Sequence, residues 1–245
     1  MTDSPAYLLF GGAGGIGSAT ARRLAASGAR VALAGRTTAP LEALASELGG
    51  LAITADARDA EQVIAAVQQA LTTFGRLDGI ANCVGSIVLK PAHLTKPEEF
   101  AEVIAQNLTS AFNVVRAAGK LLTGPASVVL VSTAASRLGL PNHEAIAAAK
   151  GGVNALVLSA AATYGARGLR FNAVAPGLVR TPMAARITSS SAAEAASVAM
   201  HVLGRLGEAD DVAPAIAWLL GSEASWVTGQ VVGVDGGLGT VRRAG

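Results

Sequence analysis

The sequence predicts a single α/β domain in which helices cover both faces of a parallel β-sheet. Short runs rich in Val, Ile, Leu and Ala alternate with helical patterns along the whole chain, as expected when strands and helices follow each other in turn. These runs are continuously apolar, which is typical of strands that are buried on both faces. The length of 245 residues suits one domain, and no linker or internal repeat divides it.

The predicted elements follow from hydrophobic spacing. In segment 60–74, Val63, Val67 and Leu71 recur at helical spacing, and the helix expected from residue 97 begins with Pro97-Glu98, a residue pair that suits a helix N-terminus. The weakly patterned segment 184–197, rich in Ser and Ala, is predicted to be a mobile surface segment. Strands are predicted at 7–10, 30–34, 51–54, 77–82, 127–131, 170–174 and 231–234, and helices at 18–27, 41–48, 60–74, 97–121, 145–164 and 212–220.

Composition excludes several classes of protein. Hydrophobic residues make up 51% of the chain and charged residues only 15%, which excludes a disordered chain. A net charge of +2 without long basic runs argues against a nucleic-acid partner, and the single cysteine, Cys83, excludes an internal disulfide and a Cys-rich metal site. Apolar runs are interrupted before about 18 residues, and the first residues lack a signal-peptide pattern, so we expect no membrane partner and a cytoplasmic location.

A glycine cluster joins the first predicted strand to the first predicted helix. Glycines at this place let backbone N–H groups approach a pyrophosphate at the helix N-terminus. The cluster matches two spacings: Gly12, Gly14 and Gly17 match G-x-G-x-x-G, whereas Gly11, Gly15 and Gly17 match G-x-x-x-G-x-G. Its position between a strand and a helix favours a Rossmann-like dinucleotide site.

The residues after the second predicted strand favour NADP(H) over NAD(H). A ribose 2′-hydroxyl usually meets an acidic residue there, but no Asp or Glu occurs between Asp3 and Glu42. The strand ends instead at Gly35-Arg36, and a guanidinium binds a 2′-phosphate through paired hydrogen bonds. The alternative is that Arg36 is a solvated loop residue.

The order and spacing of motifs along nearly the whole chain resemble the short-chain dehydrogenase/reductase (SDR) family. The resemblance selects the glycine spacing with Gly11, Gly15-Ile16 and Gly17. The other matching pieces are Asp56, Asn82-Cys-Val-Gly85, Asn107, Ser132-Thr133, Lys150, Asn172-Ala-Val-Ala-Pro-Gly177, Thr181-Pro-Met183, Leu203-Gly-Arg-Leu-Gly207 and Asp235-Gly236-Gly237.

The resemblance implies a role for many of these residues. It implies one SDR domain over 1–245, with dinucleotide binding mainly in 1–130, a substrate lid at 184–205, and a homodimer or homotetramer formed through the long helices. Asp56, with Ala57 beside it, would hold the adenine, and Asn82 and Gly85 would border the cofactor. The nicotinamide would be lined by Pro176, Gly177, Val179 and Thr181.

The sequence departs from the family at the catalytic tyrosine. The family uses Ser and Tyr-x-x-x-Lys, assisted by Asn, which places the lysine at Lys150 and the asparagine at Asn107. Counting back from Lys150 puts Ile146 at the tyrosine position and Thr133 at the serine position, with Ser132 available if the register shifts by one. Isoleucine has no proton to give, and loss of a positioned general acid costs about 10²–10⁴ in rate.

His143 is the candidate substitute for the missing acid. It precedes Ile146 by three residues, so the two share a face if the helix extends that far. Histidine titrates near neutral pH and serves as acid or base. The alternatives are that His143 is a solvated loop residue and that water ordered by Lys150 and Asn107 supplies the proton. His93 and His201 are expected at the surface.

Three functions remain open at this point. The favoured one is an NADP(H)-dependent oxidoreductase that interconverts a small-molecule carbonyl and alcohol. The second is a dinucleotide-binding protein without redox turnover, which acts as a regulator or inactive partner subunit. The third is a non-redox enzyme, such as a lyase or isomerase, that uses the same pocket.

Overall fold

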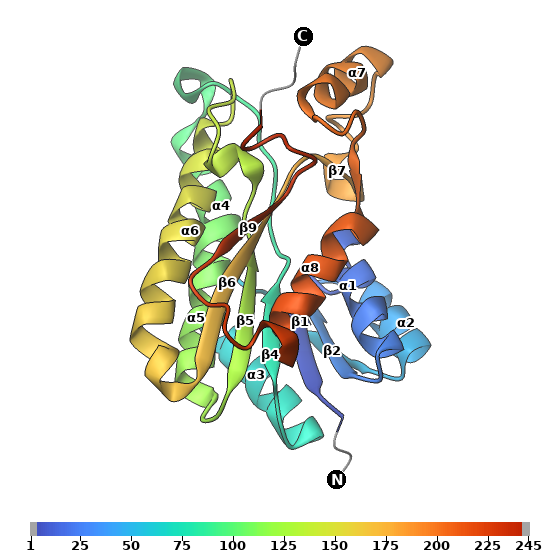
Figure 1. Cartoon of the computed structure of the whole chain (residues 1–245), viewed down its shortest axis with the longest axis vertical. Helices are drawn as coiled ribbons and strands as arrows, with labels where there is room; N and C mark the ends of the chain where they lie inside the picture. The colour runs from blue at the N-terminus through green and yellow to red at the C-terminus, as the bar shows by residue number, and fades with distance from the viewer. Residues whose placement is uncertain (1–3, 242–245) are drawn as a thin grey trace.

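The computed structural model describes residues 4–241 and confirms a single α/β domain built on a seven-stranded parallel sheet (Figure 1). The strand order is β3-β2-β1-β4-β5-β6-β9, and every neighbouring pair is parallel. The strands are β1 Ala6–Phe10, β2 Arg30–Gly35, β3 Leu51–Thr54, β4 Gly79–Asn82, β5 Ala126–Val131, β6 Leu169–Pro176 and β9 Val231–Val234.

Two hydrophobic cores lie on opposite faces of this sheet. One core packs α3, α5 and α6 against the strands through buried residues such as Val67, Val114 and Val157. The other packs α1, α2 and α8 through Leu24, Leu41 and Ile216. The main helices are α1 Gly15–Ala26, α2 Thr38–Leu48, α3 Ala60–Phe74, α4 Pro97–Ile104, α5 Ser110–Leu121, α6 Glu144–Tyr164, α7 Ser191–Met200 and α8 Ala209–Leu220.

The strand order reverses between β1 and β4. Phe10 at the end of β1 aligns with Ala34 of β2 on one side and with Asn82 of β4 on the other. The connections that leave these strand ends therefore diverge to opposite faces of the sheet. Ligands of open α/β sheets bind in the crevice at such a switch point, beyond the carboxyl ends of the strands.

The long helix expected over 97–121 is interrupted by a short π-helical segment, Ala105–Thr109, between α4 and α5. Asn107 lies within this segment and is 1% exposed. A π-bulge changes the direction in which its side chains point, and such bulges are frequent at functional sites. Hydrophobic spacing does not reveal the interruption, because buried residues continue on both sides of it.

The segment 184–197, predicted to be a mobile surface segment, has mostly exposed residues, and its second half belongs to α7, a helix that the sequence pattern did not predict. The Ser190 side chain accepts a hydrogen bond from the Ala193 N–H and caps this helix. Two short paired strands, β7 Val179–Arg180 and β8 Gly207–Glu208, lie before and after the segment 184–205. Arg180 of β7 forms ion pairs with Glu194 of α7 and Glu208 of β8, so these pairs join α7 to the two short strands.

One stretch of the described residues, Glu144–Arg167, is long and apolar enough to span a membrane by length and composition alone. This stretch contains α6, which packs on β6 through buried residues such as Val153 and Val157 and carries the buried Lys150. Core helices of α/β domains pass the same test, and α6 has their position and contacts.

Candidate cofactor and active site

The glycine cluster forms a tight turn between β1 and α1 that leaves no side chain in the way of a phosphate. Gly11 has a φ of +71°, which favours glycine, and a Cβ on Gly17 would lie 2.1 Å from the Gly11 carbonyl oxygen. A Cβ on Gly15 would lie 2.6 Å from Cγ2 of Thr181. The turn ends where α1 begins at Gly15, three residues before the predicted start, and the first N–H groups of α1 have no partner inside the helix. This backbone cradle suits a pyrophosphate.

A cavity of about 320 Å³ extends from the glycine turn toward the end of β2. Arg36, Asp56 and Ala57 line it, together with Gly11 and Gly85. Arg36 makes no hydrogen bond or ion pair within the described part of the chain, so its guanidinium is available to a ligand. The cavity therefore places a free cation where the adenosine half of a dinucleotide would lie.

Asp56 is already engaged by a neighbouring arginine. Its carboxylate accepts hydrogen bonds from Nε and Nη2 of Arg58 at 2.6–3.1 Å and from the Arg58 backbone N–H at 2.9 Å. These bonds hold the pKa of Asp56 below its usual value. Arg58 also forms an ion pair with Glu102 at 2.8 Å, which links the loop after β3 to α4. The carboxylate keeps a negative charge near the cavity, but its orientation is set by Arg58.

A second cavity, of about 400 Å³, continues from the first toward α6. The two cavities share lining residues of the glycine turn and the loop after β4, including Gly14 and Gly85. This cavity brings together the candidate residues from distant parts of the chain, namely Gly15, Ile16, Gly17, Gly85, Asn107, Thr133, Ile146, Lys150, Pro176, Gly177, Val179 and Thr181. The predicted cofactor residue Asn82 lines neither cavity: it is 2% exposed, and its side chain accepts a hydrogen bond from the Val84 N–H.

Asn107 holds the loop after β4 in place. Its Oδ1 accepts a hydrogen bond from the Ser86 N–H at 3.1 Å, and its Nδ2 donates to Ser86 Oγ and to the Val103 carbonyl oxygen, both at 3.0 Å. A Cβ on Gly85 would lie 2.8 Å from Asn107 Oδ1, so glycine is required for this approach. Every hydrogen-bonding atom of the Asn107 amide is therefore occupied by the protein.

Lys150 is a buried cation without a carboxylate partner among the residues that the structure describes. It is 5% exposed, and its Nζ donates to the Val131 carbonyl oxygen at 2.6 Å. Burial lowers its pKa to about 8. Cys83 lines the same cavity and acts electrostatically on Lys150; burial raises the pKa of its thiol to about 12, so the thiol stays protonated and unreactive. Lys150 thus titrates close to neutral pH.

Thr133 and Ser132 differ in how free their hydroxyls are. Ser132 Oγ donates to Asn154 Oδ1 at 2.6 Å and is 4% exposed. Thr133 Oγ1 accepts a hydrogen bond of 3.3 Å from the Ala135 N–H, and its hydroxyl hydrogen has no protein acceptor in the described structure. Thr133 is therefore the better placed of the two to donate a hydrogen bond to a ligand.

Ile146 faces the cavity and His143 does not. Ile146 lies on the first turns of α6 and is 5% exposed. His143 is the residue immediately before α6, and its Nδ1 lies 2.8 Å from the Pro141 carbonyl oxygen. It is absent from the residues that line either cavity. The predicted shared face with Ile146 is not formed, because the helix begins only after His143.

The expectation that His201 is a surface residue was wrong. Its side chain is 1% exposed, and both ring nitrogens have backbone partners, Ser197 and Leu178. The sequence does not indicate that His201 is buried, because the partners of its ring are backbone groups, and every residue carries such groups. His93 is exposed, as expected.

Comparison with known proteins identifies the family to which this chain belongs. Residues 11–239 match a family model described as Enoyl-(Acyl carrier protein) reductase. The chain is 35% identical to Inactive 2-(S)-hydroxypropyl-CoM dehydrogenase 2 of Xanthobacter autotrophicus, over 89% of this chain and 98% of the relative. It is 35% identical to Levodione reductase of Leifsonia aquatica, over 94% of this chain and 92% of the relative.

Solved structures of short-chain dehydrogenases/reductases superpose closely on this chain. A short-chain type dehydrogenase/reductase from Mycobacterium ulcerans superposes with a TM-score of 0.92 at 32% identity, covering 98% of this chain and 91% of the other. The crystal structure of Levodione Reductase gives the same TM-score and identity, covering 97% and 98%. Members of this family bind a nicotinamide dinucleotide, and the cradle and cavities described above suit one. The chain belongs to the short-chain dehydrogenase/reductase family of oxidoreductases.

Proposed function

We propose that this protein is an NADP(H)-dependent oxidoreductase that interconverts a small-molecule carbonyl and the corresponding alcohol. The observation that carries the proposal is one continuous cleft that runs from Arg36, past the glycine turn, to Thr133 and Lys150. When bound there, the nicotinamide supplies or accepts the hydride. The names of relatives such as Levodione reductase support a carbonyl as the oxidised substrate. We expect a cytoplasmic protein.

The preference for NADP(H) rests on the free guanidinium of Arg36. Arg58 holds Asp56, so Arg36 has no competing ion pair in the cavity. A 2′-phosphate would gain a charge-assisted hydrogen bond from this arginine, whereas a 2′-hydroxyl would leave the guanidinium without an anion in hydrogen-bond contact, because Asp56 acts on it only through its charge. The backbone cradle of Gly11, Gly15 and Gly17 would hold the pyrophosphate, and Thr181 would lie beside the nicotinamide.

The reacting carbonyl would be held by the residues at the α6 end of the cleft. The Thr133 hydroxyl is available to donate a hydrogen bond to the carbonyl oxygen. Lys150, which is charged at neutral pH, would stabilise negative charge on that oxygen as it becomes an alkoxide. Asn107 would act indirectly, because its amide is occupied in holding the Ser86 loop.

The proton for the alkoxide has two candidate sources. His143 would have to move inward on closure of the lid, since its ring lies outside the cleft. Among the residues that line the 400 Å³ cavity, the only titratable side chains are Lys150 and Cys83. Cys83 is a poor donor because its pKa is about 12. The geometry therefore favours water ordered beside Lys150 over His143.

One observation favours a second function, a dinucleotide-binding protein with little redox turnover. Ile146 occupies the position that the family resemblance assigns to the catalytic tyrosine, and its side chain faces the cavity without a proton to donate. One similar relative is named an inactive dehydrogenase. In that role the protein would act as a regulatory or inactive partner subunit.

Oxidation of NADPH with a panel of ketones and aldehydes separates the two functions. The oxidoreductase predicts substrate-dependent loss of NADPH absorbance, with turnover slowed by about 10²–10⁴ relative to a site with a positioned acid. Binding of NADP⁺ without turnover on any carbonyl would support the second function. Failure to bind either dinucleotide would overturn both.

A further inference from the structure

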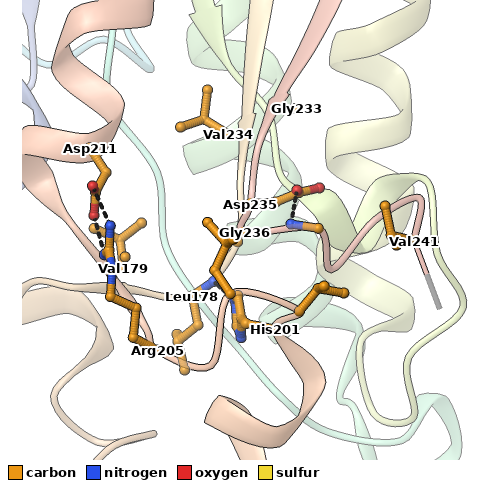
Figure 2. A pocket seen from close by; sticks show the side chains of 15 residues that line it. Leu178, Val179, His201, Arg205, Asp211, Gly233, Val234, Asp235, Gly236 and Val241 are labelled. Atoms are coloured by element: carbon orange, nitrogen blue, oxygen red, sulfur yellow. Dashed lines mark hydrogen bonds and ion pairs between the residues drawn. The ribbon is translucent and has the colours of Figure 1, made fainter. Parts of the chain in front are cut away.

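The backbone segment Gly177–Val179, which we call the strap, separates two cavities. One side of the strap lines the 400 Å³ cavity with Lys150 and Thr181. The same segment also lines a cavity of about 460 Å³, together with the end of the lid and the residues after β9 (Figure 2). His201, Arg205 and Asp235 line this second cavity. The position of the strap therefore depends on contacts made on the side away from the active site.

His201 connects the strap to the lid helix α7. Its Nε2 accepts a hydrogen bond from the Leu178 N–H at 3.1 Å, and its Nδ1 lies 2.8 Å from the Ser197 carbonyl oxygen. A carbonyl oxygen only accepts, so Nδ1 must carry the hydrogen, whereas Nε2 must be bare to accept from Leu178. Both bonds exist together only in the neutral ring with its hydrogen on Nδ1.

The strap is shaped around this ring. A Cβ on Gly177 would lie 2.6 Å from His201 Nε2, so only glycine leaves room for the imidazole. The Leu178 peptide is held on its other side as well, because its carbonyl oxygen accepts from the Gly207 N–H at 3.0 Å. The imidazole is the side chain that joins the strap to the last turn of α7.

The charged groups that face His201 already have partners. Arg205 forms two hydrogen bonds with Asp211 of α8 at 2.6 and 2.7 Å. The Asp235 carboxylate, which follows β9, accepts from the N–H groups of Gly237 and Gly239 at 2.9 and 3.0 Å. On α7 itself, Glu194 is paired with Arg180. Both acids in the cavity thus have donors of their own, and neither bonds the ring, whose nitrogens are held by backbone.

We propose that His201 is a positioning residue that ties the nicotinamide side of the cleft to the lid while its ring is neutral, and that protonation of the ring releases the strap. A protonated ring has a hydrogen on Nε2 that would point at the Leu178 N–H, so the bond from Leu178 is lost and replaced by repulsion between two donors. The strap would then detach from α7, and both the cofactor cleft and the lid would loosen together.

The first test follows the strap in the protein without any cofactor. Amide hydrogen exchange measures the protection of the Leu178 N–H relative to an unfolded chain, at about pH 8 and about pH 5.5, the range in which histidine changes charge. We expect protection to fall about tenfold at the lower pH. His201→Gln presents a carbonyl oxygen to Leu178 and has no charged form in this range, so its protection should not change. Equal losses of Leu178 protection in the wild type and in His201→Gln would overturn the proposal.

The second test uses calorimetric titration with NADP⁺ and rests on the proposed function. Because the 2′-phosphate also changes charge near pH 6, wild type and variant are compared at each pH. The wild type should lose about tenfold more affinity than His201→Gln between about pH 8 and pH 5.5. His93→Gln, at an exposed position, is the matched control and should follow the wild type.

The two tests distinguish failure of the His201 proposal from failure of the proposed function. A protein that binds no NADP⁺ contradicts the proposed function, and the exchange measurement still decides the role of His201. His201→Ala should weaken Leu178 protection at both pH values, because it removes the acceptor altogether. If His201→Ala and His201→Gln behave alike, the imidazole merely fills space and the positioning role is wrong.

Discussion

Ile146 lies one helical turn before Lys150 on α6, and both side chains are 5% exposed and line the same cavity. An apolar side chain thus sits next to a buried ammonium at the place where an alkoxide would need a proton. The pair keeps the cation that would stabilise negative charge and lacks the group that would neutralise it. We therefore expect slow carbonyl reduction, and we expect a substitution at Ile146 to change its rate.

Replacing Ile146 by tyrosine should raise the rate of carbonyl reduction by about 10²-fold or more, since it restores an ionisable hydroxyl beside Lys150. Ile146→Phe is the matched control, because it adds the same ring without the hydroxyl, and it should not exceed the wild type. The measurement is single-turnover oxidation of NADPH at saturating substrate. A gain in both variants would show that the ring, and not the proton, is responsible.

The burial of Lys150 should cost stability at neutral pH. Its pKa is about 8 in the folded protein and 10.5 in its ordinary state, so the unfolded chain binds more protons between these values. The free energy of unfolding of the wild type should therefore rise as the pH increases from 8 toward 10.5. Lys150→Met removes the buried charge and should stabilise the protein at pH 7 by a net amount of about 1–3 kcal/mol. This net value already subtracts about 1 kcal/mol for the lost hydrogen bond to Val131.

Urea unfolding of the two proteins without cofactor, at neutral and alkaline pH, checks this prediction. The advantage of Lys150→Met should shrink as the pH rises above 8, because the wild-type amine then becomes neutral in the folded state. A wild type that is the more stable protein at neutral pH would show that Lys150 is better solvated than its burial implies.

If water beside Lys150 supplies the proton, His143→Ala should change the turnover number by less than about twofold. The pH profile of reduction should then lack a step in the range where histidine titrates and fall instead as the pH rises past about 8, where Lys150 loses its charge. Steady-state kinetics over this range distinguishes the two donors. A loss of about 10²-fold in His143→Ala would reinstate the histidine as the acid.

Apolar side chains on the outer helices predict self-association. Phe112 on α5 and Leu158 on α6 are 54% and 59% exposed, and they lie on the long helices through which the family resemblance predicts association. We expect a dimer or tetramer in sedimentation at micromolar concentration, and a smaller species for Phe112→Glu and for Leu158→Glu. Leu94→Glu, at a residue 56% exposed outside these helices, is the control. A monomeric wild type would contradict the proposed interface.

Much of the fold could be predicted from the sequence, because its signals are local. β3, α3 and β9 have the predicted bounds, since glycine or polar residues mark the ends of clear apolar patterns. α7 was missed because Ser and Ala give little contrast between its two faces. The π-helical turn at Asn107 was missed because the apolar spacing continues across it.

Motif spacing in the sequence predicts many of the residues that line the cleft, but it does not predict the hydrogen bonds that these residues form. Spacing indicated Arg36, Thr133 and Lys150, and all three line the cleft. The placement of His143 depended on where α6 begins, and helix ends are the least certain part of a pattern. The burial of His201 depended on backbone groups of Leu178 and Ser197, which have no sequence signature.

Parallel calorimetric titrations with NADP⁺ and NAD⁺ are the decisive test of whether the cleft binds NADP(H) in preference to NAD(H). We expect tighter binding of NADP⁺ by about 1–3 kcal/mol, because Arg36 would form a charge-assisted bond to the 2′-phosphate. Arg36→Ala should abolish this difference, whereas Arg23→Ala, exposed on α1, should retain it. Equal affinity of the wild type for both dinucleotides, or a preference for NADP⁺ that survives in Arg36→Ala, would show that Arg36 does not select the cofactor.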